Sequence, residues 1–489
     1  MREQRLVPIV FGLAAVLLIW GTWAGSPVNS DDVMYMEMAR EMVRTGEWLE
    51  LQWQGQPIFQ RPPLPVWPVA LLGALFGWDV FWMRLPSVLM GILALGFMAG
   101  IGRRLVRDPR GEALALLLVP ATHLFFYHAR RTMTDTMLLA AVLAMLHFYL
   151  KARENPRWLV LSAAAAGWVV MTKSVLVVLP LLLVFGDLSL GPDRRLLRSR
   201  HLAWAVAIGV SVLAPWHFVM TLRHGGGFWS EYLGFNVLER AASSLIFAPD
   251  PLHYISHAIR FEGPLPYVFV IALVAVAVRW VRGRAHEDRF LLLWAAVFFL
   301  PFQFSSTRLY HYLMPLLPAL ALMTGRALGP HLRRPLLAGA AALAVLGIFF
   351  VNNGWNLLVA DYSPDQVRFH RVIQERGHPE ARLVAWNHYE LTLFFLEDRP
   401  VRMVTDDDGF FGTLDGIPMF HKAGAVEQTT AADFLGRLTA GPFHCVTTKA
   451  ELPVLCGPSG VRCGPGGWTV LDGTRAVLVT NALAPEETP

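Results

Sequence analysis

Charged side chains stand at or beside the ends of long apolar runs, where a charge is costly and a chemical role is a common reason for its presence. Asp31 and Asp32 follow the first apolar run, and Asp135 opens a later one. A carboxylate can take a proton from a hydroxyl group, whereas Lys and Arg side chains bind phosphate. The candidate cations are Arg61, Arg131, Lys173 and Arg308, and His311 with Tyr312 follows the last of them. This set predicts a site for an anionic head group, such as a phosphate or pyrophosphate, at the bilayer surface.

The segment after the first apolar run predicts a helix with Ser30 as its N-cap and Asp31 and Asp32 in its first turn. Tyr35 and Met38 recur at helical spacing, which indicates an amphipathic helix on the outer membrane surface. The alternative is that both aspartates serve only as capping residues.

The basic residues also have a structural interpretation, in which they reach lipid phosphates from the ends of membrane segments. We assign Arg84 and Arg130 to this group. Asp135 could pair with Arg131 at the i, i+4 spacing instead of taking part in chemistry. Lys173 is harder to explain in this way, because it interrupts an otherwise apolar stretch.

The composition identifies the kind of protein that positions these groups. Of the 489 residues, 54% are hydrophobic and 16% are charged, and the mean hydropathy is +0.43. Soluble domains carry roughly 25% charged residues, so an ordinary soluble enzyme is excluded, as are disordered, collagen-like and coiled-coil proteins. The net charge is +5. The basic residues collect in short connections between apolar runs, which indicates membrane topology and no nucleic-acid partner.

About eleven apolar segments approach or reach the length needed to cross a bilayer. They lie at about 7–24, 79–102, 112–128, 132–150, 157–172, 174–187, 201–222, 263–281, 290–303, 309–325 and 335–352. Lys and Arg are concentrated in the amino-terminal tail and in alternate connections, which predicts a cytoplasmic amino terminus. The predicted fold class is an α-helical polytopic membrane protein with about 11–13 transmembrane helices. A further apolar stretch at 64–77 contains two prolines and is interpreted as lying in the membrane interface.

Three outward segments are too long to be simple connections, namely 25–78, 223–262 and the tail from 354. The tail alternates strand-like runs at 381–386, 401–405, 469–471 and 476–480 with turns and short helical stretches. We predict a transmembrane domain at 1–353 and a soluble, extracytoplasmic α/β or α+β domain at 354–489. The tail holds the cysteines Cys445, Cys456 and Cys463. They could form one disulfide, for which three pairings are possible, or stay as three unpaired thiols.

Several blocks of the sequence resemble the GT-C glycosyltransferases that use lipid-linked sugars, in the branch that holds the 4-amino-4-deoxy-L-arabinose lipid A transferases and the protein O-mannosyltransferases. The resemblance covers roughly residues 1–330 and rests on the order and spacing of these blocks. They read DDVMYMEMAREMVRTGEW, QGQPIFQRPPLPVW, ARRTMTDTMLLA, GWVVMTKSVL, APWHFVM with GGGFWSEYLGFNVLER, and FSSTRLYHYLMPLLPALAL.

The resemblance implies transfer of a sugar from a polyprenyl-phosphate donor to a lipid, glycan or protein acceptor in the cell envelope, by an inverting mechanism at the outer face of a bacterial-type inner membrane. Asp31 then matches the family's candidate base, with Asp32 in place of a frequent glutamate. Asp135 matches its second acidic position. Lys173 matches a family lysine and Arg308 stands where a lysine is usual, so both would hold donor phosphate together with Arg61.

Two departures from the family pattern bear on the cofactor and the substrate. Gln60 stands where the arabinose transferases have an acidic residue that could help to hold a metal, so a divalent metal is doubtful and no cofactor is certain. A family histidine in the loop before the eighth span also has no counterpart in GFNVLER, which weakens lipid A arabinosylation as the specific reaction.

Two other functions fit a polytopic bundle with membrane-embedded charges. One is a transporter or flippase of a lipid-linked or anionic substrate, but the sequence shows neither the internal repeats nor the paired broken helices that are common there. The other is a catalytically inactive membrane scaffold, against which the retention of Asp31, Asp135 and Lys173 argues.

Overall fold

The computed structural model describes residues 5–28, 30–191, 193–242, 252–358, 362–407, 409, 417–457, 462–463 and 467–484. The chain forms two compact units. The bundle unit comprises 1–23, 48–50 and 59–360, and the C-terminal unit comprises 24–47, 51–58 and 361–489. The first outward segment therefore contributes to both units, while the predicted domain boundary at 353/354 stays a prediction.

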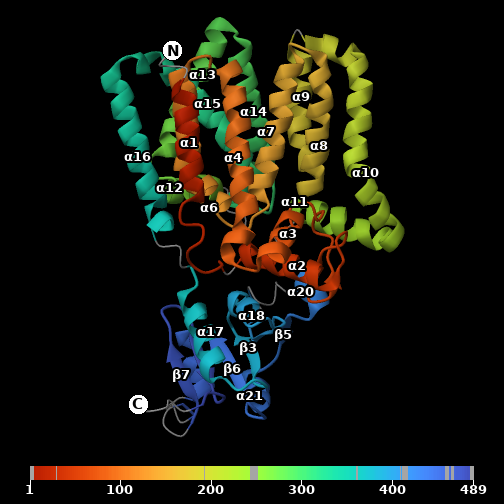
Figure 1. Cartoon of the computed structure of the whole chain (residues 1–489), viewed down its shortest axis with the longest axis vertical. Helices are drawn as coiled ribbons and strands as arrows, with labels where there is room; N and C mark the ends of the chain where they lie inside the picture. The colour runs from red at the N-terminus through yellow and green to blue at the C-terminus, as the bar shows by residue number, and fades with distance from the viewer. Residues whose placement is uncertain are drawn as a thin grey trace. The chain divides into compact units, whose positions relative to one another are not determined.

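The bundle unit is built from long apolar helices, several of which pack against one another, such as α4 on α7 and α7 on α8 (Figure 1). Its longer helices are α1 (Leu6–Ile19), α3 (Trp67–Phe76), α4 (Val80–Leu105), α5 (Pro109–Ala121), α7 (Asp135–Ala152), α8 (Leu159–Lys173), α9 (Val178–Leu190), α10 (Arg200–Trp229), α13 (Leu265–Gly283), α14 (His286–Phe304), α15 (Leu317–Leu328) and α16 (Pro335–Leu358). Shorter helices are α6 (His123–Ala129), η2 (Pro156–Trp158), η3 (Ser174–Val177), η4 (Asp193–Arg198), η5 (Ser230–Glu239), α11 (Arg240–Ala242), α12 (His253–Phe261), η6 (Tyr310–Leu316) and η7 (Gly329–Arg333).

Each of the predicted apolar segments coincides with helical structure. Among the described residues, 6 helices are long and apolar enough to cross a membrane, or up to 7 if the bent pair α5 and α6 forms one span. The remaining predicted spans correspond to shorter or more charged helices. The stretch at 64–77 forms α3, which has 10 residues and is too short to cross a bilayer.

The predicted outward segment 223–262 begins inside a helix rather than in a loop. Helix α10 continues to Trp229 through a kink at Gly225, whose φ of 54° is a conformation that favours glycine. A π-helical turn, η5, follows it directly. Residues 243–251 of this segment lie outside the described residues.

The C-terminal unit has a six-stranded mixed sheet in the order β5-β4-β3-β6-β8-β7. Strands β5, β4, β3 and β6 are parallel, and β8 and β7 continue the sheet antiparallel. The strands are β3 (Arg382–Trp386), β4 (Met403–Thr405), β5 (Val426–Gln428), β6 (Phe443–Thr447), β7 (Thr469–Asp472) and β8 (Val477–Thr480). This confirms the predicted α/β or α+β tail; β5 and β6 are additional to the predicted strands.

The C-terminal unit also contains helices, and one of them, α2, comes from the first outward segment. They are α2 (Asp31–Thr45), α17 (Pro364–Arg376), α18 (Thr392–Leu396), α20 (Pro418–Ala423), α21 (Ala431–Leu438), η8 (Lys449–Glu451) and α22 (Leu452–Cys456). A short hairpin of β1 (Gln52–Trp53) and β2 (Gln56–Pro57) follows α2 in the chain. Helix α2 is joined to α18 by Arg40, whose Nη1 donates to the Phe395 carbonyl at 3.0 Å.

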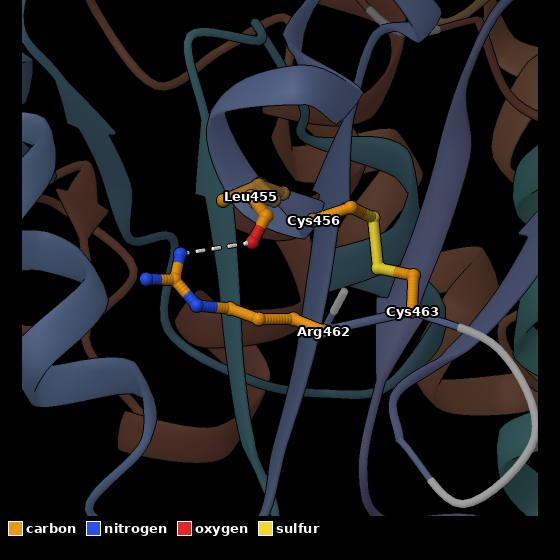
Figure 2. The surroundings of a disulfide bond; sticks show 4 residues. All are labelled: Leu455, Cys456, Arg462 and Cys463. Carbon is orange, nitrogen blue, oxygen red and sulfur yellow. Dashed lines mark hydrogen bonds between the residues drawn. A yellow bond between two sulfur atoms is a disulfide. The ribbon is translucent and has the colours of Figure 1, made fainter. Parts of the chain in front are cut away.

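One disulfide closes between Cys456 and Cys463, which leaves Cys445 as a buried free thiol (Figure 2). Within the loop that it closes, Arg462 donates from Nη1 to the Leu455 carbonyl at 3.3 Å (Figure 2). The sequence left three pairings open, and the structure selects the pair with 7 residues of sequence separation. Burial raises the pKa of the Cys445 thiol, which disfavours the reactive thiolate.

Candidate functional site

A salt bridge joins Asp135 and Lys173 inside the bundle unit. The Lys173 Nζ donates to Asp135 Oδ1 at 2.7 Å, and the two side chains are 13% and 5% exposed. Asp135 is the first residue of α7 and Lys173 is the last residue of α8, so the packing of these two helices brings the charges together. Each charge offsets the desolvation cost of the other, and removal of one partner would leave a buried charge unpaired.

Lys173 lies at a backbone break between two apolar helices. Ser174 has a φ of 49°, which is uncommon for a residue other than glycine, and a 3₁₀ turn leads from it into α9. The interruption that the sequence showed at this lysine is therefore a real end of helix α8. Strained backbone of this kind is often found at functional sites.

Arg61 lies at the same end of α7 as Asp135. Its Nη1 donates to Thr134 Oγ1 at 2.8 Å, and Thr134 is the N-cap residue of that helix. Two of the predicted phosphate-binding cations, Arg61 and Lys173, thus form hydrogen bonds with adjacent residues at the start of one helix. The N-terminus of a helix also favours negative charge through its free N–H groups.

A buried cluster holds the segments that carry these two cations. It contains Phe59 and Met171, each two residues before one of the cations, packed with Trp216, Met220, Phe228 and Tyr232 of α10 and η5. Glu231 accepts a hydrogen bond from the Phe59 amide at Oε1, at 2.8 Å, and both groups are buried. The α10–η5 region therefore fixes the backbone on which both cations depend.

His311 and Tyr312 lie beside the salt bridge. Both line a small cavity that also contacts Asp135 and Lys173, and its apolar wall includes Phe298. The cavity therefore combines one carboxylate, one ammonium, an imidazole and a phenol with apolar side chains, as ligand pockets usually do.

The other predicted cations have different surroundings. The Arg131 guanidinium lies 3.3 Å from the centre of the Tyr127 ring and donates from Nη1 to the Tyr127 carbonyl at 2.7 Å. Arg308 precedes η6 and interacts electrostatically with Tyr254. The i, i+4 pairing considered for Asp135 gives way to a salt bridge with Lys173, because α8 ends beside the start of α7.

Arg84 and Arg130, which the sequence assigned to the membrane surface, are buried within the protein, with 2% and 6% exposure. Arg130 stacks on Phe126 at 4.7 Å and donates to the Trp20 carbonyl. Protein groups, rather than lipid phosphates alone, therefore surround these two guanidinium groups.

The two aspartates at the start of α2 differ in their environments within the C-terminal unit. Asp32 is 0% exposed and accepts a hydrogen bond from the Val28 amide at 3.0 Å. Asp31 is partly exposed, and its carboxylate has no hydrogen-bond partner among the described residues. Ser30 occupies the predicted N-cap position, but its side chain makes no capping hydrogen bond. Tyr35 is buried at 2% exposure.

Sequence reasoning missed three residues that lie near Asp135, Lys173 and Arg61 or fix the chain that carries them. Thr134 binds Arg61, and Glu231 fixes the chain before it. His128 lies with its ring 5.7 Å from that of His311 and interacts electrostatically with Asp135. Glu231 carried a signal, since it is an acidic residue in an aromatic stretch, whereas Thr134 and His128 become notable only through their three-dimensional neighbours.

In the described part of the chain, no group of three or more His, Cys, Asp and Glu side chains is arranged so that it could hold a metal ion. Whether the protein requires a divalent metal stays a prediction.

Comparisons with known proteins agree on one fold. Residues 60–218 match the family described as dolichyl-phosphate-mannose-protein mannosyltransferase. ArnT from Cupriavidus metallidurans, solved with undecaprenyl phosphate, superposes with a TM-score of 0.73 at 19% identity, covering 98% of this chain and 99% of that one. The archaeal oligosaccharyltransferase AglB from Archaeoglobus fulgidus gives a TM-score of 0.56 at 12% identity, over 100% of this chain and 75% of that one.

Curated sequence relatives include several arabinosyl transferases. Undecaprenyl phosphate-alpha-4-amino-4-deoxy-L-arabinose arabinosyl transferase 2 of Pseudomonas fluorescens is 29% identical over 66% of this chain and 55% of its own length. The corresponding transferase of Pseudomonas paraeruginosa is 28% identical over 72% of this chain and 63% of its own length. The chain thus spans less than two thirds of the length of these relatives.

The fold and the apolar helices define a multi-pass membrane protein with the GT-C fold. Within that class, the chain is similar to the branch that holds the 4-amino-4-deoxy-L-arabinose lipid A transferases and the protein O-mannosyltransferases, in agreement with the resemblance of its sequence blocks.

Proposed function

We propose that this protein is an inverting glycosyltransferase that moves a sugar from a polyprenyl-phosphate donor to a lipid, glycan or protein acceptor at the outer face of the inner membrane. The observation that carries the proposal is the group of side chains at the start of α7. There Lys173 donates a hydrogen bond to Asp135, and Arg61 donates one to Thr134. A relative whose name specifies an undecaprenyl-phosphate sugar, and a structural neighbour solved with undecaprenyl phosphate, support the donor class.

The leaving group in such a reaction is a polyprenyl phosphate, and its negative charge grows as the bond to the anomeric carbon breaks. Lys173 and Arg61 would stabilise that charge, since cations held in place by a protein act most strongly where charge develops. Asp135 holds the ammonium in position before the donor arrives. Arg308 is proposed as a third ligand of the donor phosphate, and Arg131, His311 and Tyr312 are weaker candidates for contacts with the donor.

The acceptor must lose a proton when its hydroxyl oxygen attacks the anomeric carbon from the side opposite the phosphate. We assign this proton to Asp31, because its carboxylate is partly exposed and has no hydrogen-bond partner among the described residues. Asp32 is less suited, since it is buried and already accepts a backbone hydrogen bond. We propose no metal-dependent step.

The test is the mass-resolved profile of lipids and lipid-linked glycans in a deletion strain that carries the wild type, Lys173→Met or Lys151→Met. Lys151 is a matched control, because it lies near the other end of α7, where its Nζ is 3.4 Å from the centre of the Trp158 ring. We expect a polyprenyl-phosphate sugar to accumulate in the deletion strain and with Lys173→Met, and a glycosylated acceptor to return with the other two chains.

The missing product would identify the sugar and the acceptor. If Lys173→Met restores the profile as fully as the wild type does, the assigned chemistry is wrong. If the deletion changes no lipid-linked sugar, transport of another substrate becomes the better account.

A further inference from the structure

The C-terminal unit contains a second cavity, on one face of its parallel strands. Its apolar lining includes Val384 of β3, Val404 of β4, and Phe434 and Leu438 of α21. Its remaining lining is rich in charge, with three arginines and one glutamate, which are Arg382, Arg402, Arg437 and Glu427.

The strand periodicity explains why these groups meet. Side chains alternate between the two faces of a strand, so Arg382 and Val384 share a face of β3, and Arg402 shares that face with Val404 of β4. The pairing of Ala385 with Met403 sets the two strands in register. Helix α21 packs Phe434 and Leu438 over the apolar part of this face, and Arg437 of the same helix lines the cavity together with Arg382 and Arg402.

The protein neutralises only part of this positive charge. Arg437 pairs with Glu427 at 2.5 Å, and both side chains are about half exposed, at 49% and 52%. Arg382 donates from Nη2 to the Arg437 carbonyl at 2.7 Å, which leaves its charge uncompensated. The Arg402 guanidinium has no hydrogen-bond or ion-pair partner among the described residues, although it lines the cavity.

We infer that this cavity binds a phosphorylated sugar, either free in solution or as part of a lipid head group. Guanidinium groups bind phosphate through paired N–H donors, and the apolar lining residues suit the C–H face of a sugar ring. The inference does not depend on the proposed reaction, because every residue of the cavity lies in the C-terminal unit.

The experiment is calorimetric titration of the full chain, in phosphatidylcholine nanodiscs, with glucose 1-phosphate and with glucose. We expect saturable binding of the phosphosugar and none of glucose. Arg402→Ala should weaken binding about tenfold, which corresponds to loss of one charge-assisted contact. Arg371→Ala is the matched control, because Arg371 is an exposed arginine of α17 that is not among the residues lining the cavity.

Two further arms locate the binding and its source. Arg402→Ala should weaken binding by the same factor in a Lys173→Met background as in the wild type, which separates this cavity from the phosphate site proposed at Lys173. Adding phosphatidic acid to the nanodiscs should reduce the apparent affinity if lipid head groups reach the cavity, and should leave it unchanged if the ligand is free in solution. Absence of saturable binding, or equal affinities of wild type and Arg402→Ala, would overturn the inference.

Discussion

Two buried aspartates, one in each unit, are satisfied in different ways. In the bundle unit, Asp135 pairs with the side-chain ammonium of Lys173. In the C-terminal unit, Asp365 accepts hydrogen bonds from the backbone amides of Thr474, Arg475 and Ala476, at 2.8, 2.7 and 3.1 Å. A backbone amide cannot turn toward a ligand, whereas an ammonium on a flexible stem can share its donors with an arriving phosphate. The first arrangement suits chemistry and the second suits stability.

Asp31 and Asp32 show a related contrast, between a carboxylate that is open to chemistry and one that the backbone holds. Substitutions at these two positions give the largest expected effect on activity. Asp31→Asn should lower kcat by about 10²–10⁴-fold, because it removes the proposed general base, and should leave thermal unfolding unchanged. Asp32→Asn should instead lower the melting temperature, because Asp32 is buried and binds the Val28 amide. Turnover of a polyprenyl-phosphate sugar in liposomes, with a melting curve for each variant, checks both. An active Asp31→Asn protein would remove the proposed base.

Loss of the ammonium in the bundle unit should come next. Lys173→Met should lower kcat/KM by about 10²–10³-fold, the usual effect of losing one donor to developing charge. Because it also leaves Asp135 buried without its partner, the variant should be less stable than the wild type. The double variant Asp135→Asn/Lys173→Met should recover stability without recovering activity. If it recovers both, the pair is structural and the comparison with Asp365 fails.

A smaller effect should follow from the residue that fixes the chain before Arg61. Glu231→Ala removes the acceptor of the Phe59 amide, and we expect the donor KM to rise about tenfold while kcat changes little. Glu231→Gln keeps an acceptor oxygen and should behave more like the wild type. Initial rates at varied donor concentration distinguish the two, and a fall in kcat alone would argue against a positioning role.

The smallest effect on activity should come from Asp365→Asn, which tests the stability half of the comparison. Burial alone would raise the pKa of Asp365, but the backbone amides around it lower the pKa below its usual value. The ionised form therefore stabilises the fold above the unfolded pKa of about 3.9, and this contribution is lost as pH falls through the folded pKa.

We expect Asp365→Asn to reduce unfolding free energy by about 1–3 kcal/mol near neutral pH, and to reduce the acid dependence of stability. Denaturation curves across the acid range measure both quantities. An unchanged slope with pH in the variant would show that other carboxylates dominate.

Much of the fold could be predicted from the sequence, because the signals are local. Apolar runs became helices, and the predicted strand at 381–386 became β3. The strands β5 and β6 were missed because they are short or end in polar residues, so their pairing in the sheet defines them better than their composition does. Helix α2 formed where the sequence placed it, although its contact with α18 could not be read from its own residues.

The sequence by itself determined a polytopic membrane protein with acidic and basic residues at its helix ends, because the cost of charge in an apolar run can be read residue by residue. The tertiary structure decided which of these charges meet. Asp135 and Lys173 are 38 positions apart, and Arg61 is 73 positions from Thr134. Such contacts follow from how helices pack and where they end, and neither local propensity nor spacing contains that information.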